Sequence, residues 1–182
     1  QRMVLFTLNC GARDDNVCAL RWAWERKVPE LYRSVFVIPA AEFKGKRAHV
    51  LVLNDVASKV IEDCRGTHDE FVFVWRRERV KNFDEEPAMT YSRVGTMNNT
   101  AFQNARRAAK LERVRVHDLR HTFGQRLRDA GVSEEDRALL LGHAITGMPQ
   151  HYATATIARL VEAANKVTQT RDRTTLLRVV NG

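Results

Sequence analysis

Residues 34–54 read SVFVIPAAEFKGKRAHVLVLN, and they constrain the fold more than any other stretch of the chain. The stretch holds two short apolar runs, 35–38 and 49–54, which are rich in the β-branched residues that favour strands. The FKGK sequence between the runs favours a turn because it contains a glycine among polar residues. We therefore predict an antiparallel hairpin with Lys44 at its tip.

Most of the remaining chain has apolar residues at helical spacing, so the predicted class is α+β, mainly α-helical with a small antiparallel β-sheet. Residues 70–75 are either another strand or a buried turn, and the polar residues 76–95 are typical of a long loop. Helices are predicted after Asp14, after Asn54, after Asn98 or Asn99, over 116–130 with Gly131 at the C′ position, after Ser133, and around 157–164.

Apolar positions at helical spacing are predicted to face the core in several of these helices, including Val56, Val60 and Ile61 in the helix after Asn54. In the helix after Asp14 and Asp15, Val17, Leu20 and Trp24 fall at helical spacing. In the helix after Asn98 or Asn99, the buried positions are Phe102, Ala105 and Ala109, while the basic residues face solvent.

The composition indicates a soluble globular domain with an excess of positive charge. Lys and Arg total 30 against 22 acidic residues, for a formal charge of +8. Such a balance attracts polyanions, of which nucleic acid is the commonest large one, although a merely basic soluble protein has the same charge. The sequence holds three cysteines without a CxxC pair, which favours a reducing compartment, and no apolar run long enough for a membrane helix.

The HDLRH sequence, 117–121, offers the first candidate chemistry. His117 and Arg120 lie three residues apart on a predicted helix, so both side chains can meet one phosphate. The ordinary alternative is a solvated helix face. A zinc site on His117 and His121 is disfavoured, because the catalytic Glu of HExxH is missing and Arg120 repels a cation.

Arg13, Lys44 and Tyr152 are further candidate site residues, but none of them indicates a function by itself. Arg13 follows a glycine just before a helix, and Lys44 stands at the hairpin tip; a surface arginine and a solvated turn lysine are their ordinary alternatives. Tyr152 follows His143 by nine residues, and its hydroxyl needs assistance to act as a nucleophile at neutral pH because its pKa is near 10.

In order, these residues form the pattern Arg…Lys…His-x-x-Arg…Gly-His…Tyr, on Arg13, Lys44, the HDLRH and LLGH sequences, and Tyr152. This pattern resembles the catalytic domain of the tyrosine recombinases, the phage integrase family, over about residues 3–167. The DDNVCALRW and VPEL sequences are most similar to those of integrases from prophages and genomic islands.

The resemblance implies a site-specific DNA recombinase that integrates or excises a mobile element. Tyr152 would attack a DNA phosphodiester and form a 3′-phosphotyrosyl link, with no ATP, metal or other cofactor. Arg13 and Arg120 would clamp the phosphate, and Lys44 would protonate the leaving 5′ oxygen. His117 would act as base or acid near the tyrosine, and His143 would hydrogen-bond the phosphate.

Several positions depart from the commonest family pattern. Asn16 stands where an acidic residue is frequent, with Asp14 and Asp15 nearby, and Val52 stands where a proline is frequent. The neighbouring Lys46 leaves the choice of catalytic lysine open, and the loop 76–95 resembles an insertion.

The resemblance also implies a domain organisation and partners. We expect a catalytic domain over residues 1–168, a DNA-binding domain N-terminal to it that is absent from this chain, and a tail, 169–182, that packs either on its own domain or on a neighbouring protomer. The expected partners are a double-stranded DNA attachment site and other protomers, with a tetramer on DNA and a monomer or weak oligomer alone, in the bacterial cytoplasm. A catalytically silent DNA-binding relative and a DNA-relaxing topoisomerase remain alternative functions.

Overall fold

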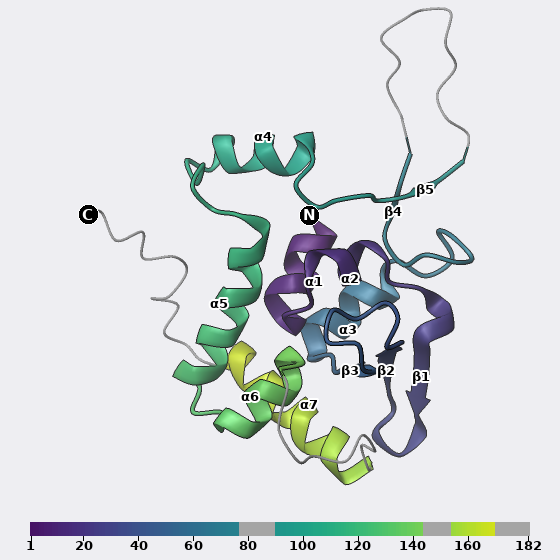
Figure 1. Cartoon of the computed structure of the whole chain (residues 1–182), viewed down its shortest axis with the longest axis vertical. Helices are drawn as coiled ribbons and strands as arrows, with labels where there is room; N and C mark the ends of the chain where they lie inside the picture. Colours follow the sequence, from purple (N-terminus) through teal and green to yellow (C-terminus); the bar gives the residue numbers. More distant parts are fainter. Residues whose placement is uncertain (77–89, 144–153, 170–182) are drawn as a thin grey trace, which may run out of the picture.

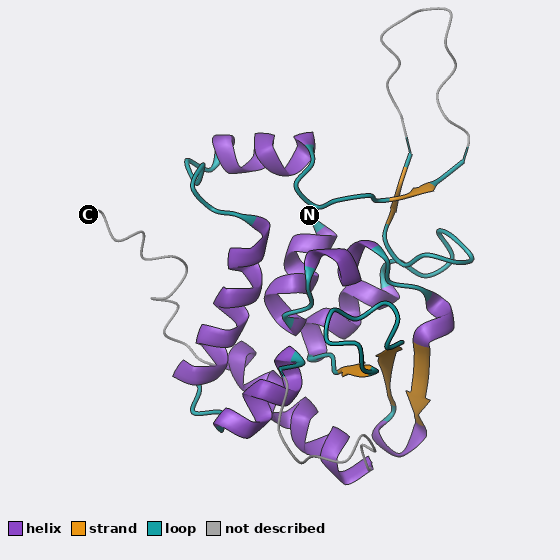
Figure 2. Ribbon diagram, in the orientation of Figure 1, coloured by secondary structure: helices purple, strands orange, loops and turns teal. Residues whose placement is uncertain are grey.

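The computed structural model describes residues 1–76, 90–143 and 154–169 of the chain (Figure 1). The predicted class is confirmed, because most elements are helices and the main sheet is a small antiparallel one of three strands (Figure 2). The helices are α1 (Arg2–Cys10), α2 (Asp14–Cys18), α3 (Asp55–Glu62), α4 (Thr100–Ala108), α5 (Val116–Asp129), α6 (Glu134–Leu141) and α7 (Thr154–Gln169), with short 3₁₀ turns at Trp22–Trp24 and Pro29–Leu31.

The predicted hairpin supplies the central strand and one edge strand of the larger sheet. Strand β2 (Arg33–Ile38) pairs antiparallel with β3 (His49–Leu51), so that Phe36 lies opposite Leu51. A strand that the sequence did not reveal, β1 (Glu25–Val28), pairs with the other edge of β2. The turn between β2 and β3 carries Lys44, as predicted.

Two clusters of buried apolar side chains hold the elements together. One cluster joins α1, α3 and the sheet, with Phe6 and Phe36 fully buried, and the other joins α5, α6 and α7 around Phe123 and Leu160. Helix α1 packs against both α3 and α5, and Figure 1 shows it between the sheet and the α5–α7 group. The two halves of the fold therefore meet along α1, whose C-terminal end leads into the loop that bears Arg13.

Several predicted helix ends are confirmed by their hydrogen bonds. Asn54 accepts from the Ala57 amide at 2.9 Å, Asn99 from the Phe102 amide at 3.1 Å, and Ser133 from the Asp136 amide at 3.2 Å. These side chains satisfy amides that the first helical turn leaves without an intrahelical partner. Helix α5 ends at Asp129, and Gly131 follows with φ of 70°.

The helix predicted from Asp14 to Trp24 is shorter than its periodicity suggests. Helix α2 ends at Cys18, because the next residues pair with a distant segment instead. The Val72 amide donates to the Leu20 carbonyl at 3.0 Å, and the Trp22 amide donates to the Glu70 carbonyl at 3.0 Å. These bonds, with the bridge between Arg21 and Phe71, hold Arg21 in an extended conformation, so tertiary pairing overrides the helical pattern.

The apolar face predicted for α4 is also wrong. Phe102 is only partly buried, and Ala105 and Ala109 are exposed. Figure 1 shows α4 set apart from the body of the domain, and among its described residues only Phe102 packs against the core. The predicted face is therefore wrong at Ala105 and Ala109, whereas Phe102 is buried in part.

Strand β4 (Val74–Trp75) pairs with β5 (Ser92–Arg93), so the ends of the predicted 76–95 loop form a two-stranded ribbon. Residues 77–89 lie outside the described residues, as do Tyr152 and the tail from 170 onward.

Candidate active site

Five of the six predicted site residues line one cavity of about 550 Å³. They are Arg13, Lys44, His117, Arg120 and His143. The sixth, Tyr152, belongs to the segment 144–153, which is outside the described residues.

The cavity follows one face of each of two helices. Its α5 residues recur every three or four positions from His117 to Arg128, and its α6 residues do so from Glu134 to Leu141. Such spacing places side chains on a common helix face. The remaining walls come from the loop before α2, the β2–β3 turn and the residue after α6. Segments from across the whole chain therefore meet at one hollow.

Arg120 occupies the junction of these segments. Its guanidinium donates to the Gly11 carbonyl at 2.5 Å and to the Leu141 carbonyl, which ties the ends of α1 and α6 to α5. The side chain is buried, and burial together with the nearby Arg13 lowers the pKa of Arg120 to about 10. Arg120 consequently stays a cation at neutral pH and is held rigidly.

Arg13 and Arg137 line the cavity with incompletely paired guanidinium groups. The Arg13 Nη1 and Arg137 Nε atoms are buried and have no hydrogen-bond partner among the described residues. Burial lowers the pKa of Arg13, and its guanidinium lies 4.9 Å from the centre of the Phe43 ring. Because an unsatisfied buried donor is costly, an anion with acceptor oxygens would be stabilised here.

The two predicted histidines are biased toward the neutral form. Burial lowers the pKa of His143, and Arg120 and Arg13 lower it further. Burial also lowers the pKa of His117, followed by the charge of His121, whose ring lies edge-on at 4.5 Å. A neutral imidazole can accept a proton or a hydrogen bond at neutral pH.

The structure also bears on two positions that depart from the family pattern. Lys44, rather than Lys46, is among the residues that line the cavity. Asn16 is buried, and its amide donates to the Glu42 carbonyl at 2.9 Å, beside Lys44. Asp14 has a different role, because it accepts from the Met97 amide at 3.0 Å.

Other cavity residues escaped the motif-based prediction. Arg128 lies eight positions after Arg120, which is a spacing that would have placed it on the same face of α5. Beside the cavity residues, His49 is 5% exposed and stacks on Phe43 at 4.7 Å. Burial and then Arg120, Arg13 and Arg47 lower the pKa of His49 to about 3. No local pattern distinguishes this histidine from the other residues of its strand.

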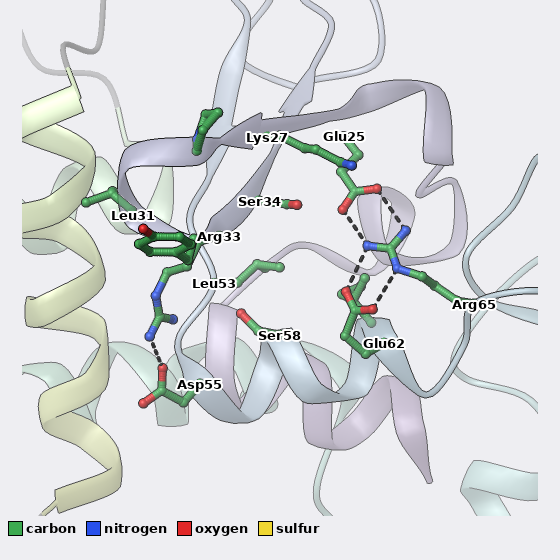
Figure 3. Close-up of a pocket in the computed structure, with 13 residues that line it drawn as sticks. Glu25, Lys27, Leu31, Arg33, Ser34, Leu53, Asp55, Ser58, Glu62 and Arg65 are labelled. Carbon is green, nitrogen blue, oxygen red and sulfur yellow. Dashed lines mark hydrogen bonds and ion pairs between the residues drawn. The ribbon is translucent and has the colours of Figure 1, made fainter.

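A larger hollow, of about 990 Å³, differs from the candidate site because its arginines are paired with carboxylates (Figure 3). There Arg65 lies between Glu25 and Glu62 and pairs with both carboxylates, and Arg33 pairs with Asp55. In the candidate site, five cationic side chains face one carboxylate; the cations are Arg13, Lys44, Arg120, Arg128 and Arg137, and the carboxylate is Glu134. The excess of cations makes the candidate site, and not the larger hollow, suited to a polyanion.

Within 1–76, 90–143 and 154–169, no group of three His, Cys, Asp or Glu side chains could hold a metal ion. In the same ranges, no helix is long and apolar enough to span a bilayer.

Comparison with known proteins agrees with the motif. The Phage integrase family matches residues 1–174. The integrase of Salmonella phage P22 is 30% identical over 166 residues, which cover 91% of this chain and 41% of that integrase. The chain thus spans less than half the length of this relative. No solved structure gives a significant match.

Proposed function

Because the chain belongs to the phage integrase family, we propose that it is the catalytic part of a site-specific DNA recombinase. Tyr152 cleaves a DNA strand and holds the 3′ phosphate as a covalent link, and the reaction integrates or excises a mobile element. The observation that carries this proposal is the meeting of Arg13, Lys44, His117, Arg120 and His143 in one cation-rich cavity.

In the cleavage step, the phenolic oxygen of Tyr152 forms a bond to phosphorus as the bond from phosphorus to the 5′ oxygen breaks. Neutral His117 takes the phenolic proton, and Lys44 gives a proton to the departing 5′ oxygen. Arg13 and Arg120 neutralise the charge that develops on the non-bridging oxygens, to which His143 also hydrogen-bonds. The unpaired Nη1 of Arg13 and the fixed guanidinium of Arg120 support these roles.

Rejoining is the reverse reaction with a different strand. A 5′ hydroxyl attacks the phosphotyrosyl bond, Lys44 accepts its proton, and the tyrosine leaves with a proton from His117. The phosphodiester energy is kept in the covalent link, so the reaction needs neither ATP nor a metal ion.

The proposal extends to the organisation of the complex. Residues 1–168 form the catalytic domain, and the tail 169–182 packs either on its own domain or on a neighbour. The partner is a double-stranded attachment site on which four protomers assemble, in the cytoplasm of a bacterial host. Size exclusion with and without residues 169–182 tests the tail, because only exchange between protomers makes association depend on it.

The decisive experiment traps the covalent intermediate. The chain is incubated with a library of random duplexes that carry a nick near the cleaved bond. The short strand that bears the released 5′ hydroxyl then diffuses away, so cleavage cannot reverse. Denaturing gels then show covalent protein–DNA adducts, and sequencing of the trapped DNA identifies the preferred site. We expect adducts with the wild type and none with Tyr152→Phe.

Tyr32→Phe is the matched control, because Tyr32 is 96% exposed at the β1–β2 turn, and it should form adducts like the wild type. Adducts that persist in Tyr152→Phe contradict the assignment of the nucleophile. A wild type without adducts favours a silent DNA-binding relative. Adducts without sequence preference, together with plasmid relaxation and no strand exchange, favour a topoisomerase.

A further inference from the structure

The β2–β3 turn that bears Lys44 is held by hydrogen bonds to two neighbouring segments and by the buried Phe43 side chain. Lys44 itself is exposed, yet the adjacent Phe43 is 3% exposed. On the side of α2, the Asn16 amide donates to the Glu42 carbonyl at 2.9 Å. On the side of α6, the Arg47 guanidinium donates to the His143 carbonyl. Both bonds connect residues near Lys44 with segments that carry other site residues, the first through the Glu42 backbone and the second through the Arg47 side chain.

Between these two bonds, aromatic rings form a stack. The Arg13 guanidinium lies 4.9 Å from the centre of the Phe43 ring, and the His49 ring stacks on Phe43 at 4.7 Å with an angle of 28° between planes. A guanidinium over a ring face is attracted by the ring quadrupole, and offset stacked rings are a favoured geometry. The stack therefore sets the position of Phe43 relative to Arg13.

Gly142, at the C-terminal end of α6, lies directly against the rings of Phe43 and His49. A Cβ atom at this position would lie 2.7 Å from Phe43 Cζ and 2.9 Å from His49 Cε1, so the rings contact bare backbone. The next residue is His143. The same ring pair thus lies against the backbone that leads to His143 and against the guanidinium of Arg13.

A charged imidazole would oppose this arrangement. His49 is 5% exposed and faces Arg120, Arg13 and Arg47, so its neutral form is strongly favoured. A neutral ring stacks without repelling the cations that are to hold the phosphate.

We propose that Asn16 and the stacked rings of Phe43 and His49 are positioning residues that hold Lys44 at the leaving 5′ oxygen of the phosphate bound by Arg13 and Arg120. The proposal rests on the general-acid role given above to Lys44. A lysine on an unfastened turn would spend little time within reach of that oxygen, and proton transfer requires close contact.

The test compares two leaving groups on the nicked duplex recovered from the library. One substrate has the ordinary 5′ oxygen at the cleaved bond, and the other has sulfur there. A thiol has a pKa of about 8.5, against about 15.7 for water, so a thiolate departs without a general acid. A defect in protonating the leaving group therefore disappears with sulfur, whereas a defect in binding the phosphate does not.

We expect Asn16→Ala and Phe43→Leu to cleave the oxygen substrate about 10- to 100-fold more slowly than the wild type, and the sulfur substrate within about 3-fold of it. Lys44→Ala should show the same rescue from a deeper loss. Asn9→Ala is the matched control: Asn9 is as buried as Asn16, both being 4% exposed, but it donates to the Leu5 carbonyl, away from the turn. Arg120→Ala should be slow on both substrates.

If Asn16→Ala and Phe43→Leu are equally slow on both substrates while Lys44→Ala is rescued, the positioning role is wrong and the general acid stands. If Lys44→Ala is not rescued, the general-acid assignment fails and this inference fails with it. Rates are compared only for variants whose thermal unfolding remains cooperative, and two substitutions in different segments keep the test available if one unfolds.

Discussion

At the scale of single residues, the site keeps three buried or half-buried cationic side chains next to a neutral imidazole. Arg120, Arg13 and Arg47 all lower the pKa of His49, after burial as the largest cause. A histidine that is neutral in the folded chain and titrates near 6.5 in the unfolded chain makes stability depend on pH. In mildly acidic solution the unfolded chain binds the proton and the folded chain does not.

We therefore expect the free energy of unfolding to fall as pH drops from about 6.5 toward about 3, with a slope of up to about 1.4 kcal/mol per pH unit from His49. Urea denaturation at pH 7 and pH 5.5 measures the effect. His49→Gln should lose about 1 kcal/mol less than the wild type over this interval. His117 and His143 contribute in the same direction, because their pKa values are lowered too.

Equal losses in the wild type and His49→Gln would show that His49 does not stay neutral in the folded chain.

A glycine gives the second prediction at this scale. Gly142 has φ of 63°, and a Cβ there would meet Phe43 and His49, whereas Gly131 has φ of 70° and nothing within 4 Å of its Cβ position. Gly142→Ala should lower the free energy of unfolding by about 2–4 kcal/mol, from backbone strain plus overpacking, and Gly131→Ala by about 1 kcal/mol, from strain alone. Urea denaturation separates them, and equal losses would mean that the ring pair yields to the added methyl group.

At the scale of elements, α3 and α4 both begin with a capping asparagine, but one asparagine is buried and the other is exposed. Asn54 and Asn99 each accept from the amide three residues on. Asn54 is fully buried and also donates to Asn9 Oδ1 at 3.1 Å and to the Ala164 carbonyl at 3.4 Å. One asparagine thus starts α3 and connects it to α1 and α7, whereas Asn99 bonds α4 and the Thr96 carbonyl three residues before it, so its bonds are local.

Asn54→Ala should therefore cost about 2–4 kcal/mol, because it removes the cap and leaves buried acceptors unpaired. Asn99→Ala should cost about 1 kcal/mol, the usual worth of a cap. The measurement is the midpoint and slope of urea denaturation for both variants. Similar losses would indicate that the Asn9–Asn54–Ala164 contacts add nothing to the cap.

At the scale of the whole molecule, the charge of +8 matters through its arrangement. Arg137 lines the candidate site with an unpaired Nε, while Arg65 is committed to Glu25 and Glu62. Replacing either arginine by glutamine changes the net charge equally. Comparing the two variants therefore distinguishes the effect of a local contact with DNA from the effect of total charge.

Arg137→Gln should weaken DNA binding and reduce the slope of log affinity against log salt by about 1, as expected for one lost phosphate contact. Arg65→Gln should leave that slope close to the wild-type value. Fluorescence anisotropy with a labelled duplex between low and moderate salt measures both. If the two variants change the slope alike, total charge and not the cavity governs binding.

The local sequence was sufficient for the features that depend on near neighbours. The hairpin follows from two β-branched runs around a turn, and the helix starts at Asn54, Asn99 and Ser133 follow from side chains that bond an amide three residues on. The candidate residues Arg13, Lys44, His117, Arg120 and His143 also came from order and spacing along the chain. Their presence in one cavity agrees with that prediction.

The tertiary structure decided whatever depends on residues far apart in the chain. The helix expected from Asp14 stops at Cys18 because residues near 71 supply backbone partners to Leu20 and Trp22, and α4 stays exposed because it stands apart from the other described elements. The bond of Arg120 to the Gly11 carbonyl spans 109 positions. His49 stays neutral because the fold buries it and brings Arg120 and Arg13 from two other segments near it, in addition to its neighbour Arg47. Sequence determined which groups the site could use, since side-chain chemistry and helical period are local. Only the fold decided which groups are buried together, and burial shifts their pKa values and leaves some donors without partners.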